Sequence, residues 1–126
     1  MIKTLIIGLI LCACFESKAQ CDNMHDLGKV VVAHMPGGLM ALIGSGCVDK
    51  GDMSKVVLTD GTELTYSNLA DFNCSGSVYF KPSKEDIELM KSTGVEIVVM
   101  GSQYASKAAT VFDTALFKEF LKCNWK

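Results

Sequence analysis

Four cysteines in the part of the chain that follows its apolar N-terminal segment constrain the fold more than any other feature. Residues 21–126 hold an even number of them: Cys21, Cys47, Cys74 and Cys123. In a short exported chain, such a count favours disulfides over free thiols. Each disulfide typically stabilises a domain by about 2–4 kcal/mol, against a total stability of about 5–15 kcal/mol. We therefore expect one small domain with two internal crosslinks.

The N-terminal segment is the reason to expect export. Lys3 supplies a positive start, residues 5–15 form an apolar run, and Ser17 and Ala19 place small residues where a signal peptidase needs them. The apolar run is too short to span a membrane, because a spanning helix needs about 20 residues. We predict that residues 1–20 are a signal peptide and that residues 21–126 form a single α+β domain. The protein is then secreted or periplasmic.

The sequence around Cys14 allows a second interpretation of this segment. Leu11-Cys12-Ala13-Cys14 has the form of a lipobox, in which Cys14 would receive an acyl chain. A protein processed in this way would be a lipoprotein anchored to a membrane. We favour cleavage after Ala19 or Gln20, because a cysteine is unusual at the second lipobox position. Contact with a membrane is therefore expected only if Cys14 is lipidated.

Strand-like patterns come first along the chain. An Asp60-Gly61 pair between two β-branched runs predicts a hairpin with a two-residue type I′ turn. Pro36-Gly37-Gly38 predicts a second turn, followed by an apolar run at residues 39–43 that fits a strand or a short helix. The remaining strands are predicted at residues 29–34, 55–59, 62–66, 77–81 and 95–100.

Helical patterns follow. Ser83 can cap a helix over residues 83–93 that ends at Gly94, and Asp113 or Thr114 can cap a last helix with one apolar stripe. Several strand connections have the length of hairpins or short loops. We therefore expect an α+β fold with an antiparallel or mixed sheet of five to six strands and two helices packed on one face.

A wider pattern runs from Val56 to Cys123. It consists of Asp60-Gly61, Cys74, a helix entry at residues 80–90, a glycine-led strand at 94–98 and a terminal segment at 117–123. In this pattern the chain resembles small secreted, functionally uncharacterised domains common in Bacteroidetes-type bacteria. The resemblance covers about half of the chain and implies no activity.

The pairing of the cysteines is left open by the residues themselves, since four cysteines allow three connectivities. We expect Cys74 to pair with Cys123, which the resemblance supports, and Cys21 to pair with Cys47.

The charged residues argue against nucleic acid as a partner. All twelve basic residues are lysines, and removing residues 1–20 leaves ten lysines against thirteen acids. A chain with no arginine, no basic run and a mild negative charge lacks the surface that neutralises phosphates.

Candidate catalytic and metal-binding residues are few. The chain has two histidines, His25 and His34, and no nucleophile-elbow, zincin or P-loop pattern. A nucleophile made of Cys47 and His34 would need a reduced thiolate, which a disulfide removes. His25, His34 and Met35 are ligand types that suit Cu(I), but their spacing forms no cluster, and packing in the core explains them more simply.

These observations predict an exported, non-catalytic binding or structural module with no cofactor and an unknown protein or surface as its partner. Such a module should expose an apolar or aromatic patch. The alternative is an extracytoplasmic protein that binds a small ligand or a metal, which should have a deep pocket with a few polar groups. The scattered aromatic residues available to line such a ligand face are Tyr66, Tyr79, Tyr104 and Trp125.

Overall fold

Two four-stranded sheets, rather than one, form the framework of the protein. The computed structural model describes residues 21–126, so the predicted signal peptide and the lipidation at Cys14 lie outside the described residues. The first sheet has the order β1-β2-β3-β6, with β1 at Met24–Asp26, β2 at Val31–Met35, β3 at Leu39–Ile43 and β6 at Ser77–Phe80. The second has the order β5-β4-β7-β8, with β4 at Met53–Leu58, β5 at Glu63–Ser67, β7 at Val95–Met100 and β8 at Lys107–Thr110.

All strand pairs are antiparallel, so the α+β prediction holds but the expected single sheet of five to six strands is wrong. β6 pairs with β3 instead of joining the β4–β5 hairpin, which divides the strands between two sheets. Two short strands were also missed. β1 lies in a polar stretch and β8 in a run of small residues, so neither has the β-branched pattern on which the prediction relied.

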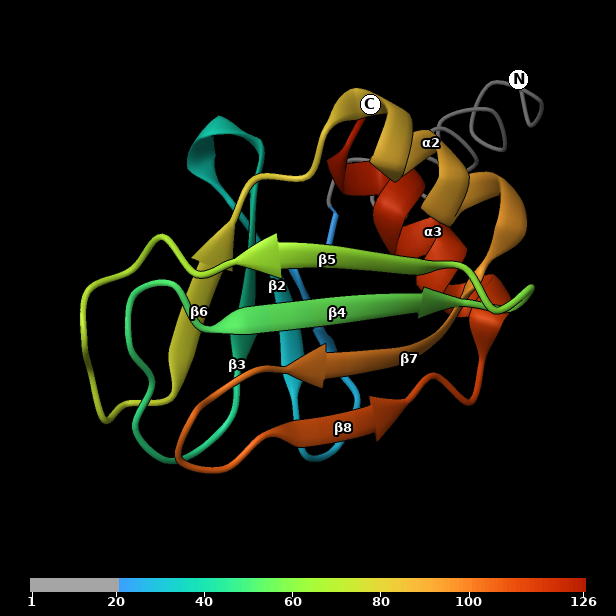
Figure 1. Ribbon diagram of the computed structural model, residues 1–126. Coiled ribbons are helices and arrows are strands. Elements are labelled where there is room, and N and C mark those ends of the chain that lie inside the picture. The colour runs from blue at the N-terminus through green and yellow to red at the C-terminus, as the bar shows by residue number, and fades with distance from the viewer. Residues whose placement is uncertain (1–20) are drawn as a thin grey trace, which may run out of the picture.

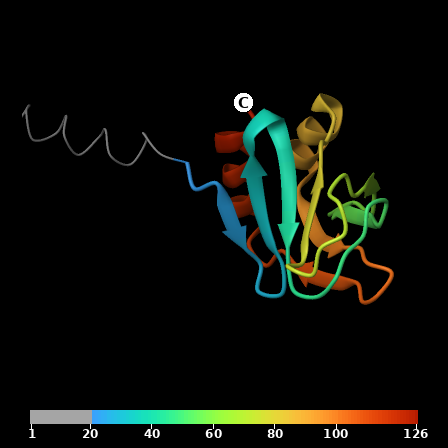
Figure 2. The same ribbon diagram turned by 90° about the vertical axis from the view of Figure 1, so that its left-hand side faces the viewer.

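The two sheets face each other, and their strands run crosswise (Figure 1). The view turned by 90° shows β2 and β3 on one side and β4 and β5 on the other (Figure 2). Each sheet has one apolar face, and packing the two faces together buries both. Tyr66 on β5 stacks on Phe80 of β6, with ring centroids 4.4 Å apart, and so connects the sheets directly.

The β4–β5 hairpin is confirmed, but its turn differs from the prediction. Leu58 and Thr62 are hydrogen-bonded across the hairpin, so the loop has three residues. Only Gly61 has a positive φ, whereas a type I′ turn needs two such residues. The Asp60 carboxylate accepts a hydrogen bond from the backbone N–H of Thr62 (2.9 Å), which favours the longer loop.

The two helices lie side by side at one end of the sheets (Figure 1). They are α2 at Lys84–Thr93 and α3 at Thr114–Asn124. A short 3-10 turn, η1, lies between β2 and β3 at Pro36–Gly38. Ser83 and Asp113 cap them as predicted, accepting hydrogen bonds from Asp86 N (3.1 Å) and Leu116 N (2.9 Å). Because the inner faces of the sheets cover each other, the helices fill the junction at this end, and the expected packing on one face of a single sheet is wrong in this detail.

The structure has two disulfides, as predicted, but both expected pairings of the cysteines are wrong. Cys21 bonds Cys123, and Cys47 bonds Cys74. The end of α3 lies beside the start of the described chain, where the Asn124 side chain donates to Asp22 O (2.8 Å). The expected bonds between Cys74 and Cys123 and between Cys21 and Cys47 would join opposite ends of the fold, because the missed strand β1 carries Cys21 to α3.

None of the helices described in residues 21–126 is long and apolar enough to cross a membrane.

Candidate interaction surface

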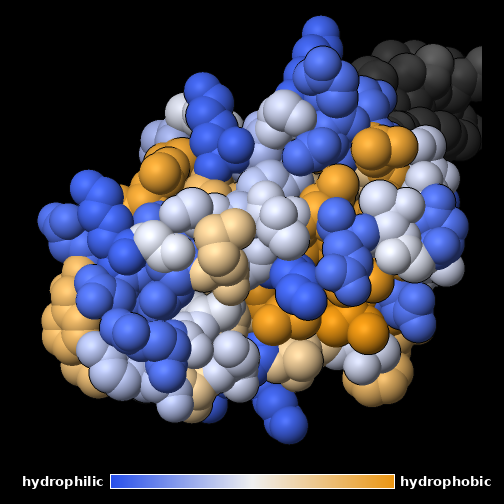
Figure 3. Space-filling view, viewed as in Figure 1, coloured by the Kyte–Doolittle hydropathy of each residue, from blue (hydrophilic) through white to orange (hydrophobic). Residues whose placement is uncertain are grey.

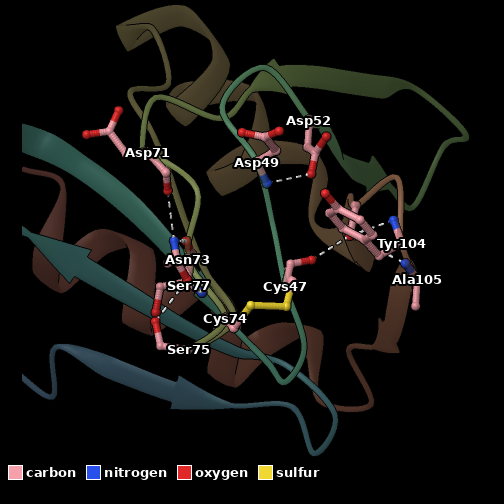
Figure 4. Close-up of a disulfide and its surroundings, with 11 residues drawn as sticks. Cys47, Asp49, Asp52, Asp71, Asn73, Cys74, Ser75, Ser77, Tyr104 and Ala105 are labelled. Atoms are coloured by element: carbon pink, nitrogen blue, oxygen red, sulfur yellow. Dashed lines mark hydrogen bonds between the residues drawn. A yellow bond between two sulfur atoms is a disulfide. The ribbon is translucent and has the colours of Figure 1, made fainter.

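Three loops meet at the end of the molecule away from the helices, and we call this region the loop end. It comprises residues 44–52, 68–76 and 101–106. The first two loops lie side by side and are joined by the Cys47–Cys74 disulfide. Backbone bridges between Gly46 and Ser75 and between Val48 and Asn73 also join them. The third loop joins them through Ser102, whose hydroxyl donates to Cys47 O (2.8 Å). The disulfide lies at the centre of this arrangement (Figure 4).

Asn68 is the buried polar residue that holds the loop end together. Its side chain donates to Asp49 O (2.9 Å) and accepts from Ala70 N (2.9 Å) and Tyr79 N (3.0 Å). Only 2% of the residue is exposed, so these hydrogen bonds satisfy a group that water cannot reach. A loop region fixed in this way loses little conformational freedom when a partner binds.

Aromatic side chains point outward from this rigid base. Phe72 is 54% exposed and Tyr104 is 59% exposed, and their ring centroids lie 6.3 Å apart at an interplanar angle of 78°. We call these two residues the aromatic pair. Leu69, on the same loop as Phe72, and Met53, at the start of β4, are also more than half exposed. The loop end and the adjoining start of β4 therefore present apolar side chains from three separate segments.

The outer face of the second sheet adds apolar surface next to Met53. Val57 lies opposite Ile97, and Val99 lies opposite Ala108, all on the side that points away from the other sheet. Neither of the helices in the described part of the chain covers this side, and Figure 3 shows hydrophobic residues gathered over it. Met53 is fixed close to the third loop, because its carbonyl oxygen lies only 1.5 Å from where a Cβ on Gly101 would be.

Acidic side chains lie on two of the three loops and accept hydrogen bonds that shape them. Asp52 accepts a hydrogen bond from Asp49 N (2.9 Å), and Asp49 accepts one from Lys50 N (2.8 Å). Asp71 precedes Phe72 directly and is exposed. With three carboxylates and one lysine, the loop end has a net negative charge.

The candidate metal ligands are not brought together. His25 packs on Phe117, with ring centroids 5.1 Å apart, whereas His34 packs edge-on against Trp125 at 4.6 Å. Met35 follows His34 on β2 and so points to the opposite face of the sheet. Across residues 21–126 there is no group of three or more His, Cys, Asp or Glu side chains that could hold a metal ion. Burial lowers the pKa of His25 below its usual value of 6.5. The negative charges of Asp113 and Asp26 raise this pKa, but by less than burial lowers it.

The four scattered aromatics have different roles. Tyr66 is buried and donates to Asp86 Oδ2 (2.8 Å), and burial together with this hydrogen bond raises the pKa of its phenol. The Trp125 indole donates to Gly38 O (3.1 Å) and is largely buried. Of the four, Tyr104 alone contributes to the aromatic pair. Sequence reasoning missed Phe72, although a large aromatic residue between Asp71 and Asn73 in a polar loop was a usable signal.

A hollow of about 440 Å³ between the β6–α2 connection and the end of α3 bears on the alternative of a ligand-binding protein. It has the volume of a small-molecule site. It is open to solvent. Its lining combines charged side chains with apolar ones: Lys81, Lys84, Lys126, Glu88, Ile87 and Trp125. Its lining within the described residues holds no convergent set of buried polar groups.

No protein-family model, curated protein or solved structure matches the chain. The resemblance to small secreted bacterial domains therefore stays a prediction.

Proposed function

We propose that the protein is an exported, non-catalytic binding module that contacts a protein partner through the aromatic pair. One observation carries the proposal: Phe72 and Tyr104 are both more than half exposed on loops that a disulfide and a buried asparagine hold in place. Aromatic residues are enriched where proteins bind each other, and they supply much of the binding free energy there.

The charge around the aromatic pair indicates the chemistry of the partner. Asp49, Asp52 and Asp71 give the loops that carry the exposed apolar side chains a net negative charge. A complementary surface has an apolar pocket for the two rings and lysines or arginines at its edge. Such a charge pattern accelerates association and selects the partner more than it adds affinity.

Two intramolecular disulfides are consistent with an extracytoplasmic location, because cytosolic thiols are kept reduced. We place the module in the periplasm or the secreted fraction, after removal of the N-terminal segment. The resemblance to secreted domains points in the same direction.

A photocrosslinker in place of Phe72 tests the proposal directly. We expect this variant to form a discrete adduct in extracytoplasmic extracts of the producing organism. Excess unlabelled protein should suppress the adduct, whereas the same excess of the Phe72→Ala/Tyr104→Ala double variant should not. The matched control carries the crosslinker at Phe112, which is 91% exposed and lies just before α3, outside the loop end.

Equal adducts from both positions, or equal suppression by both competitors, would overturn the proposal. Thermal unfolding of the double variant checks that the loops stay folded. Because both rings are largely exposed, we expect a change within about 0.5 kcal/mol in the free energy of unfolding.

A further inference from the structure

Two outer edges of the sheets differ, and the edge of the first sheet at β6 is covered. In an antiparallel pair, hydrogen-bonded residues alternate with residues whose backbone groups point away from the partner strand. The bond from Gly44 N to Gly76 O places Ser77 and Tyr79 of β6 in the second class. The Asn73 side chain bonds both backbone groups of Ser77, and Asn68 and Leu69 bond those of Tyr79.

The edge of the second sheet at β8 is open by the same reasoning. The bond from Val111 N to Glu96 O places Lys107 and Ala109 in the class that bonds β7. The backbone groups of Ala108 and Thr110 then point away from the sheet. Within residues 21–126, β8 pairs with β7 alone, and both of these residues are exposed. An open edge of this kind can accept another strand.

A groove of about 400 Å³ runs beside this edge. Its lining residues come from β8 and the residue before it, from the segment before β2 and from the loop after β3. They are Lys107, Ala108, Ser106, Lys29 and Ser45. The stem of Lys107 passes close to Gly44, since its Cδ would lie 3.4 Å from a Cβ there. Gly44 thus leaves room for this side chain in the groove.

The groove is positively charged. The ion pairs among the described residues join Lys55 to Glu63, Lys91 to Glu88 and Lys122 to Glu119, so neither groove lysine takes part in one. Of the nearby acids, Asp26 accepts a hydrogen bond from Gly28 N (2.7 Å), and Glu96 lies opposite Val111, beyond the far end of β8. Among residues 21–126, no acidic side chain lines the groove itself.

We propose that this groove binds an extended acidic peptide segment that adds to β8 as a further strand. The backbone groups of Ala108 and Thr110 supply hydrogen bonds to the added strand. Lys29 and Lys107 bind carboxylates that point into the groove. Because side chains alternate along a strand, acids at every second position of the segment suit the groove best. The inference is independent of the proposed contact at the aromatic pair.

A second copy of this chain fits the edge less well. A two-fold contact through β8 places the same patch on both copies. The pair of lysines on one copy would then approach the same pair on the other, and like charges oppose association. The charge therefore selects an acidic segment of another protein.

The test uses the disulfide-bonded protein and a short acetylated, amidated peptide that alternates Glu and Thr. We expect the peptide to shift the amide resonances of residues 107–110 and to slow hydrogen exchange at Ala108 and Thr110. Replacing both groove lysines by glutamine should weaken binding at least tenfold, whereas Lys81→Gln, a lysine outside the groove, should have no effect.

A proline at the edge separates strand addition from simple attraction of charge. Ala108→Pro removes an outward N–H and leaves the bonds of Lys107 and Ala109 to β7, so binding should fall at least tenfold. The matched control is Thr65→Pro, an outward position on β5 by the same alternation, and it should bind as the unaltered protein does.

A probe altered in its own backbone keeps the test valid if the proline variant fails to fold. N-methylation of the peptide at alternate residues blocks its hydrogen bonds but keeps its charge, and we expect it to abolish binding. Equal binding of the N-methylated peptide, or equal competition by sulfate at the same ionic strength, would reduce the groove to a site for anions and overturn the proposal. Dimerisation through β8 in sedimentation experiments would overturn it as well.

Discussion

The two ends of the molecule are held together by different forces. At the helix end, which comprises α2, α3 and the Cys21–Cys123 disulfide, Phe117 and Leu121 are buried against the sheets, and Phe120 packs on Trp125. At the loop end, Val48 is buried in the core, but the loops are joined mainly by backbone bridges and by the hydrogen bonds of Asn68 and Asn73. The larger apolar side chains of the loop end, Leu69, Phe72 and Tyr104, are exposed instead.

This difference separates stability from recognition. A region held by apolar burial has its large side chains inside, where a partner cannot reach them. A region held by a disulfide and polar bonds can place rings such as Phe72 and Tyr104 on the surface and still stay ordered. The loop end is therefore the part of the fold that is built to present apolar side chains.

Removing each disulfide gives the largest test of this comparison. The Cys21–Cys123 bond spans 102 residues and the Cys47–Cys74 bond spans 27. From the chain entropy of the unfolded state, we expect replacement by serine pairs to lower the free energy of unfolding by about 4.7 and about 3.5 kcal/mol, respectively. Chemical denaturation measures both. A larger loss at Cys47 and Cys74 would mean that the loop end needs its crosslink beyond chain entropy.

Asn68→Ala attacks the polar bonds of the loop end alone. The substitution leaves Tyr79 N and Ala70 N without their acceptor in a buried site. We expect a loss of about 3 kcal/mol in the free energy of unfolding, together with increased mobility of Phe72 and Tyr104 in NMR relaxation. Asn23→Ala, an exposed asparagine near the helix end, is the control and should change stability by less than about 0.5 kcal/mol. Equal losses for both would show that Asn68 does not organise the loops.

Tyr66→Phe tests the connection between the sheets and the helix end. The phenol of Tyr66 donates to Asp86 on α2, while its ring stacks on Phe80. Removing the hydroxyl should cost about 1.5 kcal/mol, because the acceptor is charged, and should leave the stacking intact. Tyr79→Phe serves as the matched control, since within residues 21–126 no side-chain hydrogen bond involves the Tyr79 hydroxyl. A loss of equal size in the control would contradict the assignment.

The smallest expected effect is a pH dependence of the free energy of unfolding, which arises from His25 at the helix end. Burial against Phe117 and Phe120 lowers the pKa of His25, so the unfolded chain takes up its proton first as the pH falls. Its contribution to stability is complete above pH 6.5 and decreases as the pH falls from there towards the pKa in the folded state. Thermal unfolding between pH 8 and pH 5 should show a decline that is shallower in His25→Gln. Identical profiles for the two proteins would contradict this.

Much of the fold follows from local patterns in the sequence. The strands with β-branched runs, both helix caps and the hairpin at Gly61 are set by neighbouring residues, so they were predicted. The split into two sheets depends on β6 pairing with β3, about 40 residues away in sequence, for which no local pattern exists. Because β1 and β8 are short and lack apolar alternation, the pairing of strands decides their conformation.

The candidate sites were harder to predict for the same reason. Tyr104 was recognised as an aromatic residue of interest, but its neighbour Phe72 lies on a different loop. The two loops are joined through the Cys47–Cys74 bond and the hydrogen bond from Ser102 to Cys47. The pairing of the cysteines was wrong because it depends on where β1 lies. Lys29 and Lys107 are likewise far apart in sequence and come together through the order of the strands in the fold.

The Cys21–Cys123 bond also has a mechanical consequence. Tension applied through chain segments before Cys21 and after Cys123 passes across one covalent link and bypasses both sheets, because the residues between them form a closed loop. A pulling experiment on the oxidised protein should therefore record almost no extension, whereas the reduced protein should unravel. The loop end and the β8 edge would keep their shape under load, so binding at either place need not weaken when the partner is tethered to a moving surface.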